Sequence, residues 1–187
     1  LTAGNVGVQL STTAGGAMWL TPDAVELVLF GNAGRTGQAR DLDLSGSTLD
    51  AFALSTLAVS FGTKVREGVS VGVTGKYHIG HGILVGRDLG SQATADPLAI
   101  DVDLPLLLPL EGAGIGDGGS GIGLDVGARI ERGVWTFAAT ARNLVNTFSW
   151  DVDALGYRPG TALFNDTSSE VDFDERSSAE APAVLTE

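Results

Sequence analysis

The sequence contains no cysteine, and this absence excludes disulfide frameworks, thiolate-bound zinc, iron–sulfur clusters and thiol nucleophiles. It also lacks a long apolar run. The longest candidate covers residues 104–110 and is interrupted by Pro105 and Pro109, whereas a transmembrane helix needs roughly 20 apolar residues. If the protein crosses a membrane, we therefore expect it to do so with strands.

Basic residues are scarce as well. The 11 Lys and Arg are outnumbered by 23 Asp and Glu, and the net charge of -12 disfavours nucleic-acid binding, which needs clustered cations. The chain has 27 glycines and a mean hydropathy of +0.19. This composition predicts an apolar, folded chain that is rich in small residues, and not a disordered one.

Period-two alternation is the clearest pattern present, and its longest stretch is residues 69–83. One face of that strand carries the apolar side chains of Val69, Val71, Val73, Tyr77, Ile79 and Ile83. The opposite face carries Ser70, Gly72, Thr74, Lys76, His78, Gly80 and Gly82. A preceding alternation at 57–62 and a turn region at 63–68 complete a first hairpin.

A second hairpin is predicted over residues 121–142, with its connection at Arg132 and Gly133. Its apolar face comprises Ile122, Leu124, Val126, Ala128, Ile130, Trp135, Phe137, Ala139 and Ala141. Its polar face includes Asp125, Arg129, Glu131 and Arg142. Weaker strands at 6–10 and 100–104 bring the expected total to about six.

Two segments depart from the alternation. Thr21, Pro22 and Asp23 form an N-cap, a first-turn proline and an acidic first turn, so residues 21–32 predict a short helix that ends at Gly31-Asn32. Residues 151–187 lose periodicity and become acidic, which predicts a long solvated loop. We expect one domain over residues 1–187, in which the 21–32 segment is plug-like.

The fold expected is all-β: an antiparallel up-and-down transmembrane β-barrel, present here as a partial barrel or open curved sheet. The 69–83 strand is longer than usual soluble strands, and the connections alternate between short hairpin turns and the long stretches 84–120 and 151–187. We predict lumen-facing Lys76, His78, Asp125, Arg129, Glu131 and Arg142. The predicted lipid-facing residues are Val69, Val71, Val73, Ile122, Leu124, Val126, Trp135 and Phe137.

Residues 121–129 (GIGLDVGAR), the strand 135–141, Arg142-Asn-Leu144 and Phe148-Ser-Trp150 resemble a strand pair of FadL-type outer-membrane transporters and PorV-like barrels. The segment GNAGRTG after the Pro22 helix and the 51–73 hairpin are similar to the region before that pair. The resemblance covers about residues 20–150. It implies a Gram-negative outer-membrane location, a lipid bilayer as partner and passive transport of apolar small molecules.

Six strands are fewer than the eight that a barrel needs, and no aromatic C-terminal strand is present. The dipeptide at Ala181-Pro182, followed by aliphatic residues, is similar to the opening of a further strand in that family. Together with the start at Leu1, these features lead us to expect a mature form or a truncated piece of a longer chain.

The other motifs give no site. Gly116-x-Gly118-x-x-Gly121 precedes a strand instead of the helix that would hold a pyrophosphate. His78 and His81 point to opposite faces of one strand, so a shared metal is not expected, and the acidic tail lacks calcium-loop spacing. Hence we expect no catalytic residue, metal or cofactor, and we expect that the protein is not an enzyme.

Two further functions remain open from sequence. One is a non-transporting barrel that acts as a scaffold or secretion partner, as PorV-like proteins do. The other is a soluble, exported β-sandwich that binds a ligand, because alternation alone fits any sheet with one wet face. The direction in which the alternating apolar residues point separates the membrane alternatives from the soluble one.

Overall fold

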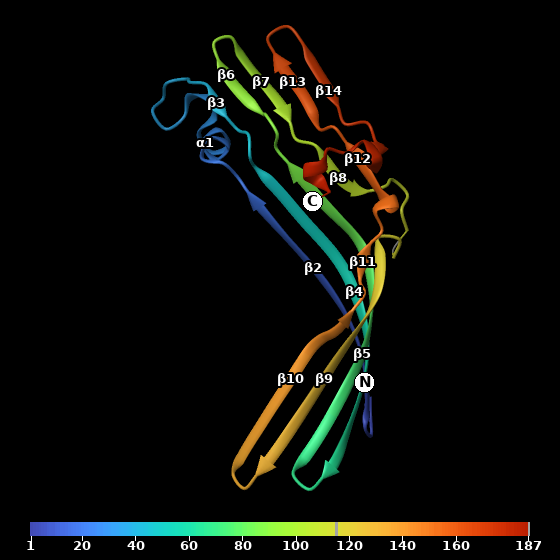
Figure 1. The fold of residues 1–187 in the computed structure, drawn as a ribbon. Helices are drawn as coiled ribbons and strands as arrows, with labels where there is room; N and C mark the ends of the chain where they lie inside the picture. The colour runs from blue at the N-terminus through green and yellow to red at the C-terminus, as the bar shows by residue number, and fades with distance from the viewer. Residues whose placement is uncertain (115, 187) are drawn as a thin grey trace. The chain divides into compact units, whose positions relative to one another are not determined.

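The computed structural model describes residues 1–114 and 116–186. It is mostly antiparallel β-sheet, with 61% strand and one short α-helix, which confirms the all-β prediction (Figure 1). The chain divides into two compact units: unit 1 comprises 1–14, 53–82 and 114–151, and unit 2 comprises 15–52, 83–113 and 152–187. Because β2, β4 and β5 each contribute residues to both units, the single-domain expectation stays a prediction.

Unit 1 is built on long strands with the order β1-β2-β4-β5-β9-β10. Consecutive hairpins explain this order, since β4 is joined to β5 and β9 to β10 by two-residue connections. Short β11 also pairs with β9. The bounds of these strands are β1 (Thr2–Ala3), β2 (Val6–Trp19), β4 (Thr48–Arg66), β5 (Val69–Arg87), β9 (Gly119–Arg132), β10 (Trp135–Asn146) and β11 (Ser149–Trp150).

Glycines set both tight turns of unit 1. Gly68 has φ 72° and Gly133 has φ 61°, a left-handed conformation that side chains with a Cβ rarely adopt. Gly133 is the first central residue of the β9–β10 turn, where a type II′ hairpin requires glycine. The two predicted hairpins are therefore confirmed. The first turn is tighter than the predicted 63–68 region, because β4 continues to Arg66.

Unit 2 contains a five-stranded sheet with the order β14-β13-β7-β6-β3. The helix α1 (Pro22–Phe30) packs beside it, and Ala24, Leu42, Leu44 and Ala93 form one small core. A second core, of Leu107, Leu155 and Leu185, lies where β12 pairs with β8 and β15. The strands are β3 (Leu42–Asp43), β6 (Gln92–Ala95), β7 (Leu98–Asp103), β8 (Leu106–Pro109), β12 (Leu155–Arg158), β13 (Thr161–Asn165), β14 (Ser169–Asp172) and β15 (Arg176–Ser177).

The helix prediction is confirmed in detail. Thr21 caps α1 by accepting a hydrogen bond from the Ala24 amide, Pro22 occupies the first turn, and Gly31 ends the helix with φ 67°. A 3-10 turn, η1 (Gly31–Ala33), follows.

Two predictions about connections are wrong. The expected solvated loop 151–187 contains β12 to β15 and three 3-10 turns, η2 (Val152–Ala154), η3 (Ser178–Glu180) and η4 (Ala183–Leu185). The stretch 84–120 likewise contains the end of β5, the strands β6, β7 and β8, and the start of β9. Of these, β7 confirms the weaker strand predicted at 100–104. Residues 183–185 do not open a strand, because Leu185 is buried in the second core. The count of six strands is too low, since the described residues form fifteen.

The sheet of unit 1 is open among the described residues. Its β10 edge has no partner beyond β9, and β2 pairs only with β1 and β4. The partial barrel or open sheet expected from the sequence matches this topology, and a closed barrel is absent from residues 1–114 and 116–186.

Candidate functional site

Strand register sorts the side chains of unit 1 into two faces. In the β5–β9 pair, Val73 lies opposite Val126 and Thr74 lies opposite Asp125, so odd residues of β5 share a face with even residues of β9. In the β9–β10 pair, Phe137 lies opposite Ile130. The predicted apolar and polar residues of these three strands therefore do gather on opposite faces of one sheet.

The same two faces continue into β4 and β2. Hydrogen bonds join Ser60 to Thr74 and Thr56 to His78, and Thr12 to Ser55, which fixes the register of the three strands. We define the apolar face of unit 1 as Val6, Val8, Leu10, Leu57, Val59, Phe61, Val65, Val69, Val71, Val73, Tyr77, Ile122, Leu124, Val126, Ile130, Trp135 and Phe137. All eight residues predicted to face lipid belong to it.

The apolar face is uncovered. Apart from Val69 and Leu124, which are half-buried, each of its residues is exposed, from 38% at Val126 to 73% at Leu10. A soluble monomer rarely leaves a contiguous apolar patch of more than a few hundred Å² in contact with water. An exposed apolar face that spans five strands is typical of an interaction surface.

The length of the apolar face matches a bilayer. From Val69 to Ile79, a half-buried residue that continues this face one step beyond Tyr77, the strand rises about 34 Å, at about 3.4 Å per residue. A tilt of about 40° converts this length to a height of about 26 Å, close to the apolar band of about 25 Å on outer-membrane barrels.

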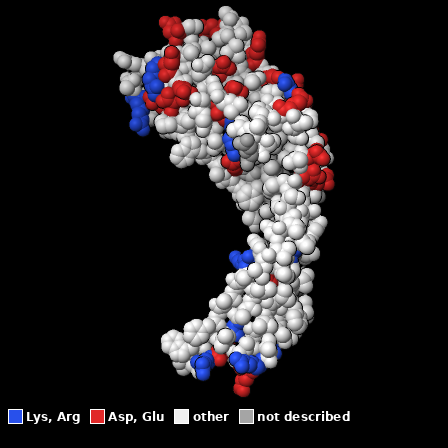
Figure 2. All heavy atoms as spheres, viewed as in Figure 1, with Lys and Arg blue, Asp and Glu red and all other residues white. Residues whose placement is uncertain are grey.

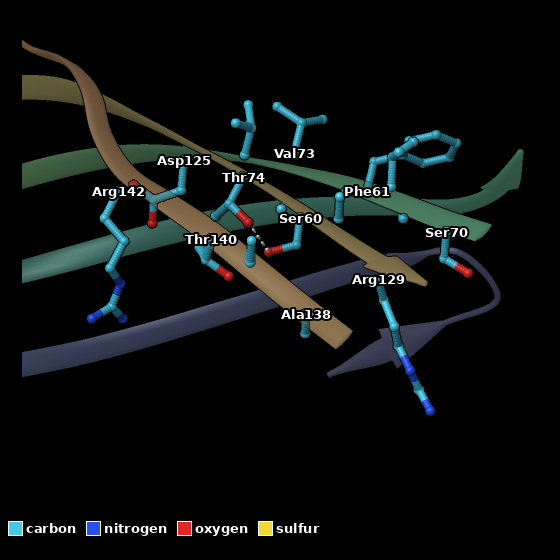
Figure 3. Close-up of a pocket in the computed structure, with 17 residues that line it drawn as sticks. Ser60, Phe61, Ser70, Val73, Thr74, Asp125, Arg129, Ala138, Thr140 and Arg142 are labelled. Atoms are coloured by element: carbon cyan, nitrogen blue, oxygen red, sulfur yellow. Dashed lines mark hydrogen bonds between the residues drawn. The ribbon is translucent and has the colours of Figure 1, made fainter. Parts of the chain in front are cut away.

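The opposite, polar face forms a shallow groove of about 460 Å³. Figure 3 shows Val73 and Phe61 on one side of the sheet, and Ser60, Thr74, Arg129 and Arg142 extending to the other. Small residues also line this groove, among them Gly62, Gly72, Gly127 and Ala138. Short side chains and hydroxyl groups leave room for water along the wall.

An ion-pair network crosses three strands of the polar face. Lys76 Nζ lies 2.7 Å from Asp125 Oδ1 and donates a hydrogen bond to Asn143 Oδ1 at 2.8 Å. The backbone N–H of Asn143 donates to Asp125 Oδ1 at 2.8 Å. The Lys76 and Asp125 side chains are each only 14% exposed. Each charge therefore has a partner, which removes much of the cost of withdrawing it from water.

Asn143 is a site residue that the sequence analysis missed. It has φ 54°, and the β9–β10 register shifts between Ala141 and Val145, so it forms a bulge that turns its amide and side chain toward Lys76 and Asp125. Asparagine tolerates this left-handed conformation better than most residues. The sequence signal that could have identified Asn143 is its place in the middle of the motif Arg142-Asn-Leu144.

The remaining predicted lumen residues lie on the polar face but form separate contacts. Arg129 pairs with Glu131 at 2.5 Å, and His78 Nδ1 lies 2.9 Å from Thr56 Oγ1. Arg142 lines the groove near Asp125. Whether these residues face a lumen stays a prediction, as does the lipid contact of the apolar face.

His81 lies inside β5, which continues to Arg87. Its Nε2 lies 2.8 Å from Ser55 Oγ, whereas His78 contacts Thr56, so the two histidines have separate partners. Among the described residues, no group of three or more His, Asp or Glu side chains is arranged to hold a metal ion.

The glycine-rich motif at 116–121 serves close packing. A Cβ at Gly121 would collide with the Phe148 backbone, and one at Gly80 would lie 2.7 Å from the Trp150 ring. Phe148 and Trp150 form an edge-to-face pair with ring centroids 5.0 Å apart. Gly121 of the motif lets Phe148 approach β9, and Gly80 of β5 gives the Trp150 ring of β11 the same room, so the motif has a structural role.

In unit 2, Arg40 clamps the start of α1. Its guanidinium lies 2.9 Å from both Asp23 and Glu26. The hydrogen bond from Arg40 lowers the pKa of Asp23, and hydrogen bonds from the Arg35 amide and Arg40 lower the pKa of Glu26. Asp103 behaves oppositely, because burial and the nearby Asp88 and Asp101 raise its pKa.

Comparison with known proteins returned no matching family model, no matching curated protein and no matching solved structure. Among the described residues, no helix has the length and apolar character needed to cross a bilayer. The resemblance to FadL-type and PorV-like barrels therefore stays a prediction from the sequence.

Proposed function

We propose that this chain is part of a Gram-negative outer-membrane β-barrel, in which unit 1 forms a section of the bilayer-spanning wall. Its apolar face contacts lipid and its polar face lines an aqueous lumen. The observation that carries the proposal is the exposed apolar face, which runs across five long strands. Lipid supplies the apolar environment that these side chains need.

The soluble sandwich explains unit 1 less well. A sandwich packs a second sheet about 10 Å from the first and buries the facing side chains. In unit 1, the described apolar side chains have no second layer, and Phe61, Ile122 and Phe137 are exposed by 47%, 54% and 62%. In addition, β4 and β5 each run for 19 residues, well beyond usual soluble strands.

For the activity, we propose passive transport of hydrophobic small molecules, which rests on the family resemblance. The non-transporting scaffold is a second candidate. One observation favours it: the Lys76–Asp125–Asn143 network and the Ser60–Thr74 hydrogen bond tie strands together across the polar face, where an apolar cargo would find few apolar contacts.

Detergent dependence tests the membrane assignment. We expect the purified chain to give a β-rich circular dichroism spectrum and heat-modifiable migration in detergent micelles, and to aggregate in buffer without detergent. A monodisperse, folded protein in plain buffer would overturn the proposal and favour the sandwich. Uptake of an apolar dye by vesicles that contain the inserted protein would then separate transport from scaffolding.

A further inference from the structure

The turn end of unit 1 is rich in cations. Lys64 and Arg66 end β4, and Arg129 and Arg132 end β9, so four of the 11 basic residues lie within a few positions of the two tight turns. Figure 2 shows Lys and Arg atoms in blue at this end. Only Glu67 and Glu131 oppose these charges there.

Three of the four cations have no partner. Arg129 pairs with Glu131, whereas Lys64, Arg66 and Arg132 are exposed and their side chains form no hydrogen bond or ion pair with the described residues. The rest of unit 1 does little to offset this surplus of positive charge, since the whole unit holds only five of the 23 acidic residues. An anionic surface would therefore meet cations that are free to bind it.

Apolar side chains surround the same turn. Val134 is 95% exposed, and the rings of Trp135 and Phe137 are stacked at 6.4 Å while remaining 67% and 62% exposed. Arg132 lies directly opposite Trp135 in the β9–β10 register, so its side chain starts from the apolar face. A long basic side chain beside an exposed indole suits the boundary between hydrocarbon and headgroups.

We propose that the turn end of unit 1, defined by Lys64, Arg66, Arg132, Val134 and Trp135, binds the anionic phospholipid headgroups of the leaflet that it faces. The inference rests on the proposed membrane assignment and adds the partner's chemistry. Trp135 sits at headgroup depth and Arg132, which starts from the apolar face, reaches the lipid phosphates. Lys64 and Arg66 lie on the Ser60 side of β4 and add positive charge at the same end. Each cation near an anionic bilayer surface adds about five-fold to lipid affinity.

The test measures apparent lipid affinity in two kinds of vesicle. Unfolded protein is diluted from urea into phosphatidylcholine vesicles, or into phosphatidylcholine mixed with phosphatidylglycerol, and the folded fraction is followed by tryptophan fluorescence and heat-modifiable migration. We expect phosphatidylglycerol to raise the affinity at low salt. Arg132→Gln should reduce this gain about five-fold, and Arg132→Lys should retain it.

Arg35→Gln is the matched control, because it removes one exposed cation from unit 2 and should leave the gain unchanged. Equal affinity for the two vesicle types would overturn the inference, as would equal losses in the Arg132→Gln and Arg35→Gln variants. Inhibition by millimolar inorganic phosphate at constant ionic strength would assign the site to free anions and also overturn it. Failure to insert into either vesicle would instead contradict the membrane assignment itself.

Discussion

Adjacent residues of β5 offer the sharpest test of which face meets lipid. Val73 lies on the apolar face opposite Val126, and Thr74 lies on the polar face opposite Asp125. The two positions sit at almost the same height in the sheet. We therefore compare Val73→Arg with Thr74→Arg, which place the same charge on opposite faces.

The magnitudes follow from the surroundings. Arginine on the lipid face near the bilayer midplane costs about 2–4 kcal/mol, a loss of about 30-fold to several hundred-fold in folding equilibrium. Thr74→Arg breaks the hydrogen bond with Ser60, at a cost of about 1 kcal/mol, and places the new cation near Asp125, which offsets part of that cost.

The assay is urea titration of protein folded in phosphatidylcholine vesicles, followed by tryptophan fluorescence. We expect Val73→Arg to shift the midpoint to much lower urea than Thr74→Arg. Val65→Arg, close to the turn, should cost less than about 1 kcal/mol because the penalty falls toward the interface. Equal effects of Val73→Arg and Thr74→Arg, or a larger effect at Val65, would refute the assignment of faces.

Three further predictions concern individual contacts. Lys76→Met should destabilise the vesicle-folded protein by about 1–3 kcal/mol, because it leaves the Asp125 carboxylate without its cation. A double-mutant cycle with Asp125→Leu should give a coupling energy of about 0.5–3 kcal/mol. Gly121→Ala should cost about 1–3 kcal/mol by collision with Phe148, whereas Gly75→Ala, with open space around its Cβ, should be milder. Because the folded pKa values of Asp23 and Glu26 lie below the ordinary 3.8 and 4.5, the Arg40 clamp stabilises α1 above those values and is lost as pH falls below about 4. Hydrogen exchange of α1 amides should show this loss, and Arg40→Gln should weaken the pH dependence, because only the Arg35 and Asp43 amides would then hold the two carboxylates.

Alternation predicted the long hairpins of unit 1 because the signal is local. A strand with one apolar and one polar face has period two, and residues 69–83 and 121–142 repeat it many times. The helix could be predicted for the same reason, since Thr21, Pro22 and Gly31 each act on the helix turn next to them. The face of each candidate residue followed directly from these patterns.

Most of the unit 2 sheet was missed, apart from the weaker strand predicted at 100–104, because its strands are held by distant partners. β13 pairs with β7, about sixty residues earlier, and Thr161 of β13 lies opposite Asp103. These strands are six residues or fewer, and β7 and β14 each carry two acidic side chains, so their composition is close to that of a solvated loop. Local propensity is weak where backbone pairing across the sequence decides the structure.

Strand direction gives a last prediction. The five long strands β2, β4, β5, β9 and β10 alternate in direction, so the two outermost long strands, β2 and β10, run the same way. The two-residue β1 pairs only with Val6 and Gly7 of β2, and the rest of β2 has no partner on that side among the described residues. An antiparallel barrel that contains this sheet must add an odd number of strands between those edges, because single-chain outer-membrane barrels have an even total.

An unpaired edge amide costs several kcal/mol in hydrocarbon, so the proposed membrane form must supply these strands from elsewhere in the polypeptide or from a second copy. Every second amide of β10, those directed away from β9, should then be protected from hydrogen exchange in vesicles. Rapid exchange of these amides in fully inserted protein would show that the β10 edge faces water, and that the sheet does not lie in the bilayer as a wall.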